Sequence, residues 1–339
     1  SDNAPELTYD KAKVLKQAEA VMSTDDILAK EFGLATTKTT NDSIQFRGLM
    51  NTIAKWAELD TNEDKKFSFN QSPYTISRDI DALRGNNITF EGNGNVFDVN
   101  NKNILAKIGA AQNVTINKLN NAGTTVNSGT LSLNEVQYNG NIANDANLKT
   151  EGNTKIAGKL SNTGLVKNSG NLTVSGGLQN ENTIANSGTL EVADGDAVNS
   201  GKISGGIKFS NATLDNSGEI DSVYDSAFTA ASGTALNNTG SIGEIKNSVF
   251  EYGANGVGIA TAKDLTLAAD NGDLNFNGSG TALKMEAANT VNIKSLNGGK
   301  VKIAGITEAN GGKLALSGDG SDGSEIALNG TVDNANVSL

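Results

Sequence analysis

One segment of the chain has oxygen donors at the spacing that a calcium loop requires. Asp60, Asn62 and Asp64 stand at the first, third and fifth positions of a twelve-residue window that ends at Gln71. A calcium loop takes ligands from these positions and from a bidentate Glu at the twelfth. Here Lys65 replaces the turn glycine and Gln71 replaces that Glu, which removes a charged ligand. The segment therefore predicts either a calcium site or, as the favoured interpretation, a solvated charged loop; no other cofactor is expected.

A second acidic segment runs from Gly318 to Glu325 and alternates glycine with Asp and Ser. It lacks the nonapeptide repetition of calcium-binding β-rolls, so a plain loop is expected there.

Carboxylate pairs are the only residues that suggest catalysis. Hydrolysis of a glycosidic bond uses two carboxylates about 5–10 Å apart, and Asp194 with Asp196, or Asp221 with Asp225, are candidate pairs. The chain has no His and no Cys, which removes the commonest general base and the thiolate nucleophile. No Arg follows Arg84, so a lyase acting on acidic sugars would lack its usual cation. We therefore expect a protein that is not an enzyme.

Aromatic residues make up only 5% of the chain. Their densest group beyond residue 100 consists of Tyr224, Phe228, Phe250 and Tyr252. Aromatic side chains bind sugars and proteins well, so these four are the candidate binding residues. The alternative is that an insertion between coils packs them against the rest of the domain.

Charge and composition exclude several classes of partner. The net charge of −11 and the pI near 4.6 argue against nucleic-acid binding, which depends on Lys and Arg. No stretch approaches the roughly 20 apolar residues of a membrane span. The repeating pattern described below still runs at Leu339, so we expect a piece of a longer surface protein.

Residues 1–85 differ from the remainder. They hold both prolines, the single Trp56, all three arginines and two amphipathic helical patterns, one over about residues 9–32 and one after Asn41 and Asp42. We expect a small α-helical N-terminal region that caps the next domain, because exposed strand edges must be covered. An independent binding domain is the second possibility.

From residue 86 to residue 339, short apolar–polar–apolar triplets recur between Gly, Asn and Ser. Examples are Leu172-Thr173-Val174 and Leu190-Glu191-Val192. A period of two places the first and third side chains on one face of a short strand.

The same frame of residues also repeats along the chain. The segments that begin at Leu119, Leu160 and Leu178 each place Asn-Ser-Gly eight residues later, and further Asn-Ser-Gly units follow at Asn199 and Asn216. A unit of roughly 20 residues with variable turns indicates a solenoid. Gly and Asn are poor helix formers, and neither a leucine-rich nor a hexapeptide frame is present.

The predicted fold is therefore an all-β, right-handed parallel β-helix (solenoid) of roughly a dozen coils over residues 86–339; right-handed crossovers are the rule for parallel strands. Gly and Asn accept the positive φ angles of tight turns, and stacked Asn side chains form amide ladders. For Asn-Ser-Gly we favour this turn-and-ladder role over a recognition motif displayed in rows.

The Asn- and Gly-rich coils, the triplets, the acidic surface and the missing Cys resemble the passenger domains of bacterial autotransporters (type V secretion) and related β-helical adhesins. The resemblance covers residues 86–339 and rests on composition and repeat pattern rather than on one diagnostic motif. The strand pattern of that family's C-terminal membrane barrel is not seen in this sequence. It implies an extracellular or cell-surface protein that mediates cell adhesion or self-association.

We therefore expect a non-enzymatic adhesin-like module whose partner is a host or bacterial cell-surface protein or glycan, or a second copy of itself. The alternatives are a β-helical polysaccharide lyase or hydrolase and a purely structural stalk.

Overall fold

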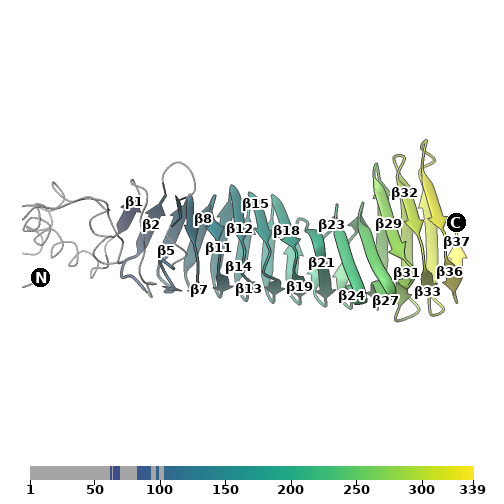
Figure 1. Cartoon of the computed structure of the whole chain (residues 1–339), viewed down its shortest axis with the longest axis horizontal. Helices are drawn as coiled ribbons and strands as arrows, with labels where there is room; N and C mark the ends of the chain where they lie inside the picture. The colour runs from purple at the N-terminus through teal and green to yellow at the C-terminus, as the bar shows by residue number, and fades with distance from the viewer. Residues whose placement is uncertain (1–61, 63, 69–81, 93–96, 99–102) are drawn as a thin grey trace, which may run out of the picture. The chain divides into compact units, whose positions relative to one another are not determined.

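The computed structural model describes residues 62, 64–68, 82–92, 97–98 and 103–339. In this part of the chain there are strands and no helix, and the strands pair in parallel with strands one turn away in the sequence (Figure 1). The chain thus winds as a β-solenoid, and the predicted all-β parallel β-helix is confirmed for the described residues. None of these segments is a helix that could cross a membrane.

The two helices predicted within residues 1–85 fall outside the described residues, so the helical cap stays a prediction. In the same region, β1 (Lys65–Ser68) pairs in parallel with β2 (Asn87–Glu91). Coil-type pairing therefore includes residues that precede the predicted boundary at residue 86.

The chain forms two compact units, Ser1–Ala157 and Gly158–Leu339. In the first unit, the strands form three parallel stacks, one for each side of the coil. The first stack contains β1, β2, β5 (Asn113–Asn117), β8 (Thr130–Asn134) and β11 (Asn147–Glu151). The second stack contains β3 (Phe97–Asp98), β6 (Leu119–Asn121), β9 (Gln137–Tyr138) and β12 (Asn153–Ile156). The third stack contains β4 (Lys107–Ile108), β7 (Thr124–Asn127) and β10 (Asn141–Asn144).

The second unit begins with the same three-sided coil. The first side contains β13 (Leu160–Asn162), β16 (Leu178–Asn180), β19 (Asp196–Asn199), β30 (Thr281–Met285), β33 (Ile306–Glu308) and β36 (Thr331–Asp333). The second side contains β14 (Leu165–Asn168), β17 (Thr183–Asn186), β20 (Lys202–Ser204), β22 (Glu219–Ile220) and β25 (Ser241–Ile242). The third side contains β15 (Asn171–Val174), β18 (Thr189–Ala193), β29 (Asp273–Gly278), β32 (Lys300–Ile303) and β35 (Glu325–Leu328).

Later coils of this unit are larger. Three long strands, β21 (Lys208–Asn216), β24 (Ala227–Asn238) and β27 (Val249–Thr261), run through both the first and the third side. A fourth stack contains β23 (Val223–Tyr224), β26 (Ile245–Lys246), β28 (Leu265–Asp270), β31 (Thr290–Leu296), β34 (Lys313–Gly318) and β37 (Asn336–Ser338). The coil grows accordingly: Leu160 pairs with Leu178, whereas Val301 pairs with Ile326.

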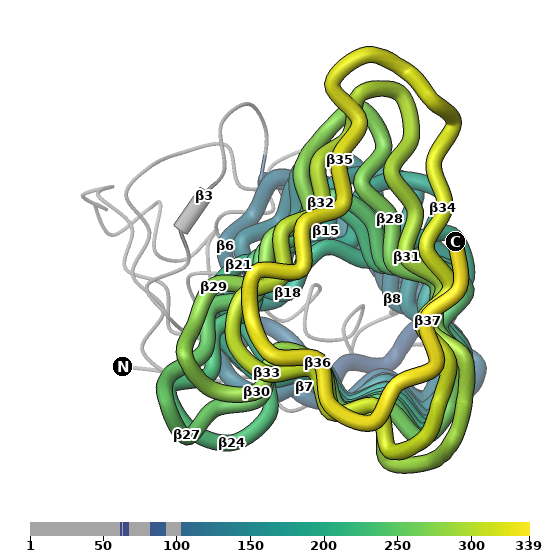
Figure 2. Tube along the Cα trace, turned by 90° about the vertical axis from the view of Figure 1, so that its right-hand side faces the viewer, coloured from purple at the N-terminus to yellow at the C-terminus, as the bar shows by residue number. Residues whose placement is uncertain are grey.

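The hand of the second unit is visible in its last coil. Seen from the C-terminal end in Figure 2, the chain passes from β34 through β35 and β36 to β37 counterclockwise while it advances toward the viewer. This is the right-handed sense that was predicted.

The inward side chains of each triplet form the core. Leu172 pairs with Leu190 and Val174 with Val192, and all four are buried. Farther along, four buried phenylalanines stack one per coil with ring centroids 4.9, 4.8 and 4.6 Å apart, namely Phe209, Phe228, Phe250 and Phe276. Like side chains at the coil spacing thus fill a narrow continuous core.

The Asn-Ser-Gly units lie at the corners, with the Asn side chain inside. The Nδ2 atom of Asn168 donates to the Oδ1 atom of Asn186 at 2.8 Å and to the backbone oxygen of Gly170 at 3.0 Å. At another corner, Asn199 and Asn216 of two further units belong to a continuous ladder of five buried asparagines, which also contains Asn162, Asn180 and Asn238. The turn-and-ladder role of this motif is therefore confirmed.

Candidate functional site

The four candidate binding aromatics do not form one exposed surface. Phe228 and Phe250 belong to the core stack and are completely buried. Tyr252 is also buried, and its hydroxyl donates to the backbone oxygen of Ala304 at 2.6 Å. Only Tyr224 is partly exposed, with its ring against Gly206 of the neighbouring coil. These rings thus mainly stabilise the enlarged coils.

The predicted calcium loop is only partly described. Asp60 and Gln71 lie outside the described residues, whereas Asn62 and Asp64 are exposed. The Oδ1 atom of Asp64 accepts hydrogen bonds from the side-chain and backbone nitrogens of Asn87, at 2.9 and 3.3 Å. In the part of the chain that the structure describes, no three acidic, His or Cys side chains are grouped to hold a metal ion. The calcium site stays a prediction.

The acidic segment near Gly318 is an ordered loop. Asp319 accepts hydrogen bonds from the Ser321 hydroxyl at 2.6 Å and from the backbone nitrogens of Asn297 and Ser321 at 2.8 and 3.0 Å. These bonds, the Ser321 hydroxyl first, lower the pKa of Asp319 to about 2. The carboxylate thus orders the loop and ties it to the preceding coil.

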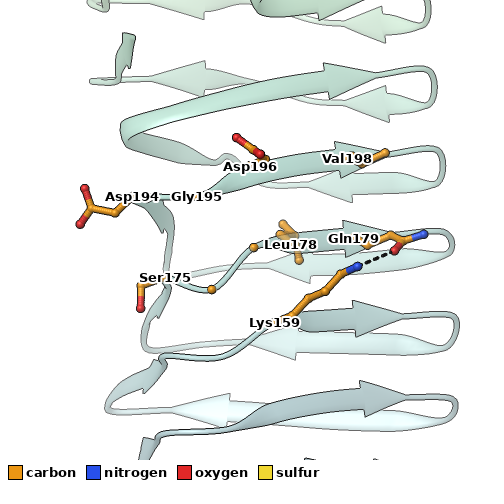
Figure 3. A pocket seen from close by; sticks show the side chains of 10 residues that line it. Lys159, Ser175, Leu178, Gln179, Asp194, Gly195, Asp196 and Val198 are labelled. Atoms are coloured by element: carbon orange, nitrogen blue, oxygen red, sulfur yellow. Dashed lines mark hydrogen bonds between the residues drawn. The ribbon is translucent and has the colours of Figure 1, made fainter. Parts of the chain in front are cut away.

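A recess of about 400 Å³ lies on the early coils of the second unit. Residues at equivalent positions of successive coils form an outward-facing row, and the recess forms where one residue of such a row has no side chain. Lys159, Gly177, Asp196 and Thr213 occupy equivalent positions in four successive coils. Because Gly177 lacks a side chain, a gap opens between the ammonium group of Lys159 and the carboxylate of Asp196 (Figure 3).

The neighbouring row forms one wall of the recess. It contains Gln179 and Val198, and the Val198 side chain is 44% exposed, unusually high for a large apolar residue in this structure. Ser175 lines the recess at the corner that precedes Gly177, on the same side as Asp194 (Figure 3). The recess therefore combines one aliphatic surface with a hydroxyl, an amide and two opposite charges.

Hydrogen bonds fix the polar side chains of the recess before any ligand arrives. The Nζ atom of Lys159 donates to the Oε1 atom of Gln179 at 3.0 Å, and the Nε2 atom of Gln179 donates to Glu181 at 3.0 Å. The Oδ1 atom of Asp196 accepts from the Thr213 hydroxyl at 2.6 Å. Side chains held in this way lose little conformational entropy on binding.

The carboxylate pair considered for hydrolysis borders this recess. Asp194 and Asp196 flank Gly195 at the corner before β19, and in Figure 3 the Asp194 carboxylate points away from the recess while Asp196 lies beside it. Asp194 accepts a hydrogen bond from Asn211 at 3.1 Å. In the other pair, Asp221 accepts from the backbone nitrogen of Gly205 at 3.0 Å.

Sequence reasoning missed Lys159, Gly177, Gln179 and Val198. The signal was available in the 18-residue frame, since aligning Leu160 with Leu178 places Lys159 opposite Gly177. A missing side chain in a row of larger ones marks a gap, but only once the row is known to face outward.

No model of a known protein family matches the chain, and no similar curated protein or solved structure is found. The geometry of the described residues defines the class of this protein as a parallel β-solenoid.

Proposed function

We propose that this chain is a non-enzymatic, adhesin-like module displayed on a cell surface or secreted, which binds a cell-surface protein or glycan through the lateral face of its coils. The observation that carries the proposal is the lateral recess between Lys159 and Asp196, where polar groups held by their neighbours border an exposed aliphatic side chain. Ligand sites commonly combine these features, and about 400 Å³ lies within their usual size range.

The surroundings of the recess argue against nucleic-acid recognition. Outward positions of the adjacent coils hold mostly short polar residues such as Ser161, Thr173 and Thr189. The net charge of −11 repels nucleic acid. Together with the resemblance to autotransporter passenger domains and the absence of Cys from the sequence, these features support export to the cell surface.

Glycan hydrolysis is the second candidate, because Asp194 and Asp196 border the same recess. Their carboxylates point in different directions in Figure 3, and each accepts a hydrogen bond from the next coil. Two acids acting on one glycosidic bond would have to flank that bond. Binding without cleavage is therefore the proposal that better fits the arrangement, and a purely structural stalk is the third candidate.

The test presents the purified chain to immobilised host and bacterial glycans and matrix proteins, and scores both retention and release of shortened sugars. The proposal expects retention without shortened products. Release of shortened sugars would overturn the proposal in favour of a glycan-degrading enzyme. If the chain retained no component of the panel, a structural stalk or a self-associating protein would be the better account.

A further inference from the structure

We infer that the recess between Lys159 and Asp196 is a subsite for one neutral pyranose unit of a glycan chain. This inference rests on the proposed binding function and specifies the chemical class of its ligand.

The size and openness of the recess indicate a single unit of a longer polymer. The gap at Gly177 spans one coil of the row, so Lys159 and Asp196 lie two coil spacings apart, roughly 10 Å at the Cα positions. A recess of about 400 Å³ has room for a ring-sized group, and because it is open to the outside of the coils, a bound glycan chain can continue on either side.

The donors and acceptors around the gap match hydroxyl groups. The Oδ1 atom of Asp196 accepts from Thr213, whereas its second carboxylate oxygen has no hydrogen bond within the described residues. This second oxygen can therefore accept a hydrogen bond from a sugar hydroxyl. The amide of Gln179 and the ammonium group of Lys159 lie together on the opposite side of the gap. Hydrogen bonds to charged groups are the stronger ones, so Asp196 is the polar anchor in this site.

The apolar part of the site and its charge balance select a neutral ligand. Val198 offers an exposed aliphatic surface beside Gln179, against which the C–H face of a pyranose can pack. Beside the recess, the carboxylate of Asp196 balances the ammonium group of Lys159, because the Asp194 carboxylate points away (Figure 3), so there is no excess positive charge for an acidic sugar. Arg, which holds sugar carboxylates bidentately, does not occur after Arg84.

The experiment measures binding of the full chain to six tetrasaccharides by calorimetry: neutral ones of glucose, mannose, galactose and N-acetylglucosamine, an acidic one of galacturonic acid and a cationic one of glucosamine. Each is titrated into the wild-type protein, into the variants Asp196→Asn and Lys159→Met, and into the control Asp215→Asn. Asp215 is the matched control because it is an exposed carboxylate one coil farther along the Val198 row that also accepts a side-chain hydrogen bond, from Asn237.

We expect at least one neutral tetrasaccharide to bind, with affinity lowered about tenfold or more in Asp196→Asn and unchanged in Asp215→Asn. Binding of the acidic or the cationic tetrasaccharide alone would overturn the neutral-sugar assignment. A neutral sugar that binds equally well to Asp196→Asn would overturn the site while leaving the proposed function in place. If no sugar binds but the chain retains a protein of the panel, the inference fails and the proposed function stands; if nothing is retained, both fail. Unchanged circular dichroism and melting temperature of each variant exclude misfolding as the cause.

Discussion

A buried asparagine at a coil corner joins three parts of the solenoid at once. The Nδ2 atom of Asn180 donates within its own turn to Asn182, to the next amide in the ladder and to the backbone oxygen of Lys202, while its Oδ1 atom accepts from Asn162. Because the side chain is fully buried, water cannot replace these bonds if it is removed.

Replacing Asn180 with Ala is therefore expected to lower the free energy of unfolding by about 2–4 kcal/mol, since the ladder neighbours are left with unsatisfied buried groups. Urea denaturation followed by circular dichroism measures the change. Asn182→Ala is the control, because its side chain is exposed and donates one hydrogen bond, to Thr163 at 3.0 Å. Equal losses in the two variants would contradict the structural role of the ladder.

A second residue-scale prediction concerns alkaline pH. Burial raises the pKa of the Tyr138 hydroxyl to about 12, above the value near 10 of an exposed tyrosine. The neutral hydroxyl, which is hydrogen-bonded to Thr125, thus stabilises the folded state fully below pH 10, and that contribution is lost as the pH rises toward 12.

The stability difference between the wild-type protein and Tyr138→Phe is expected to be constant from pH 7 to 9.5 and to shrink between pH 10 and 12. Chemical denaturation of both proteins at each pH measures it. The comparison removes the titration of lysines, which is common to the two proteins. A difference that does not vary with pH would show that the hydroxyl is not buried as described.

At the scale of strands and coils, much could be predicted from sequence because the triplet pattern reports directly which side chains face inward. Leu172-Thr173-Val174 and Leu190-Glu191-Val192 are paired strands in the structure, as their shared frame indicates. The intervals between successive Asn-Ser-Gly units vary along the chain, and the sequence alone does not explain why. In the structure Asn186 lies at one corner and Asn199 at another, where each belongs to a different ladder.

The long strands and the stacked phenylalanines could not be predicted, because both depend on contacts between coils. Phe228 and Phe250 are 22 residues apart, and only their register places one above the other. The aromatic cluster therefore resembles a binding surface in sequence although most of it is core. The recess was missed for a related reason, since an absent side chain at Gly177 is visible only between its neighbours.

The aromatic stack gives a prediction at this scale. Phe228→Ala is expected to lower the free energy of unfolding by roughly 3–5 kcal/mol, because it leaves a cavity between rings 4.9 and 4.8 Å away. Thr229→Ala, on the exposed side of the same strand, should change it by less than about 0.5 kcal/mol. Thermal and urea unfolding measure both variants. A loss of ligand retention in Phe228→Ala without any loss of stability would instead make this residue part of a binding surface.

At the scale of the whole molecule, the solenoid separates stability from recognition. Inward triplets and corner ladders determine how the coils stack, so outward positions are free to vary without disturbing the core. Small departures from repetition, such as a glycine in a row of larger residues, then create a local site on a regular surface. This separation is compatible with the proposed lateral binding.

The most direct measurement is amide hydrogen exchange of the full chain, followed by mass spectrometry, with and without the panel component that it retains. Lateral binding at the recess predicts slower exchange confined to peptides that cover residues 159–161, 175–179 and 194–198, with the retained component recovered intact. Protection restricted to other coils, or a component recovered in shortened form, would contradict it.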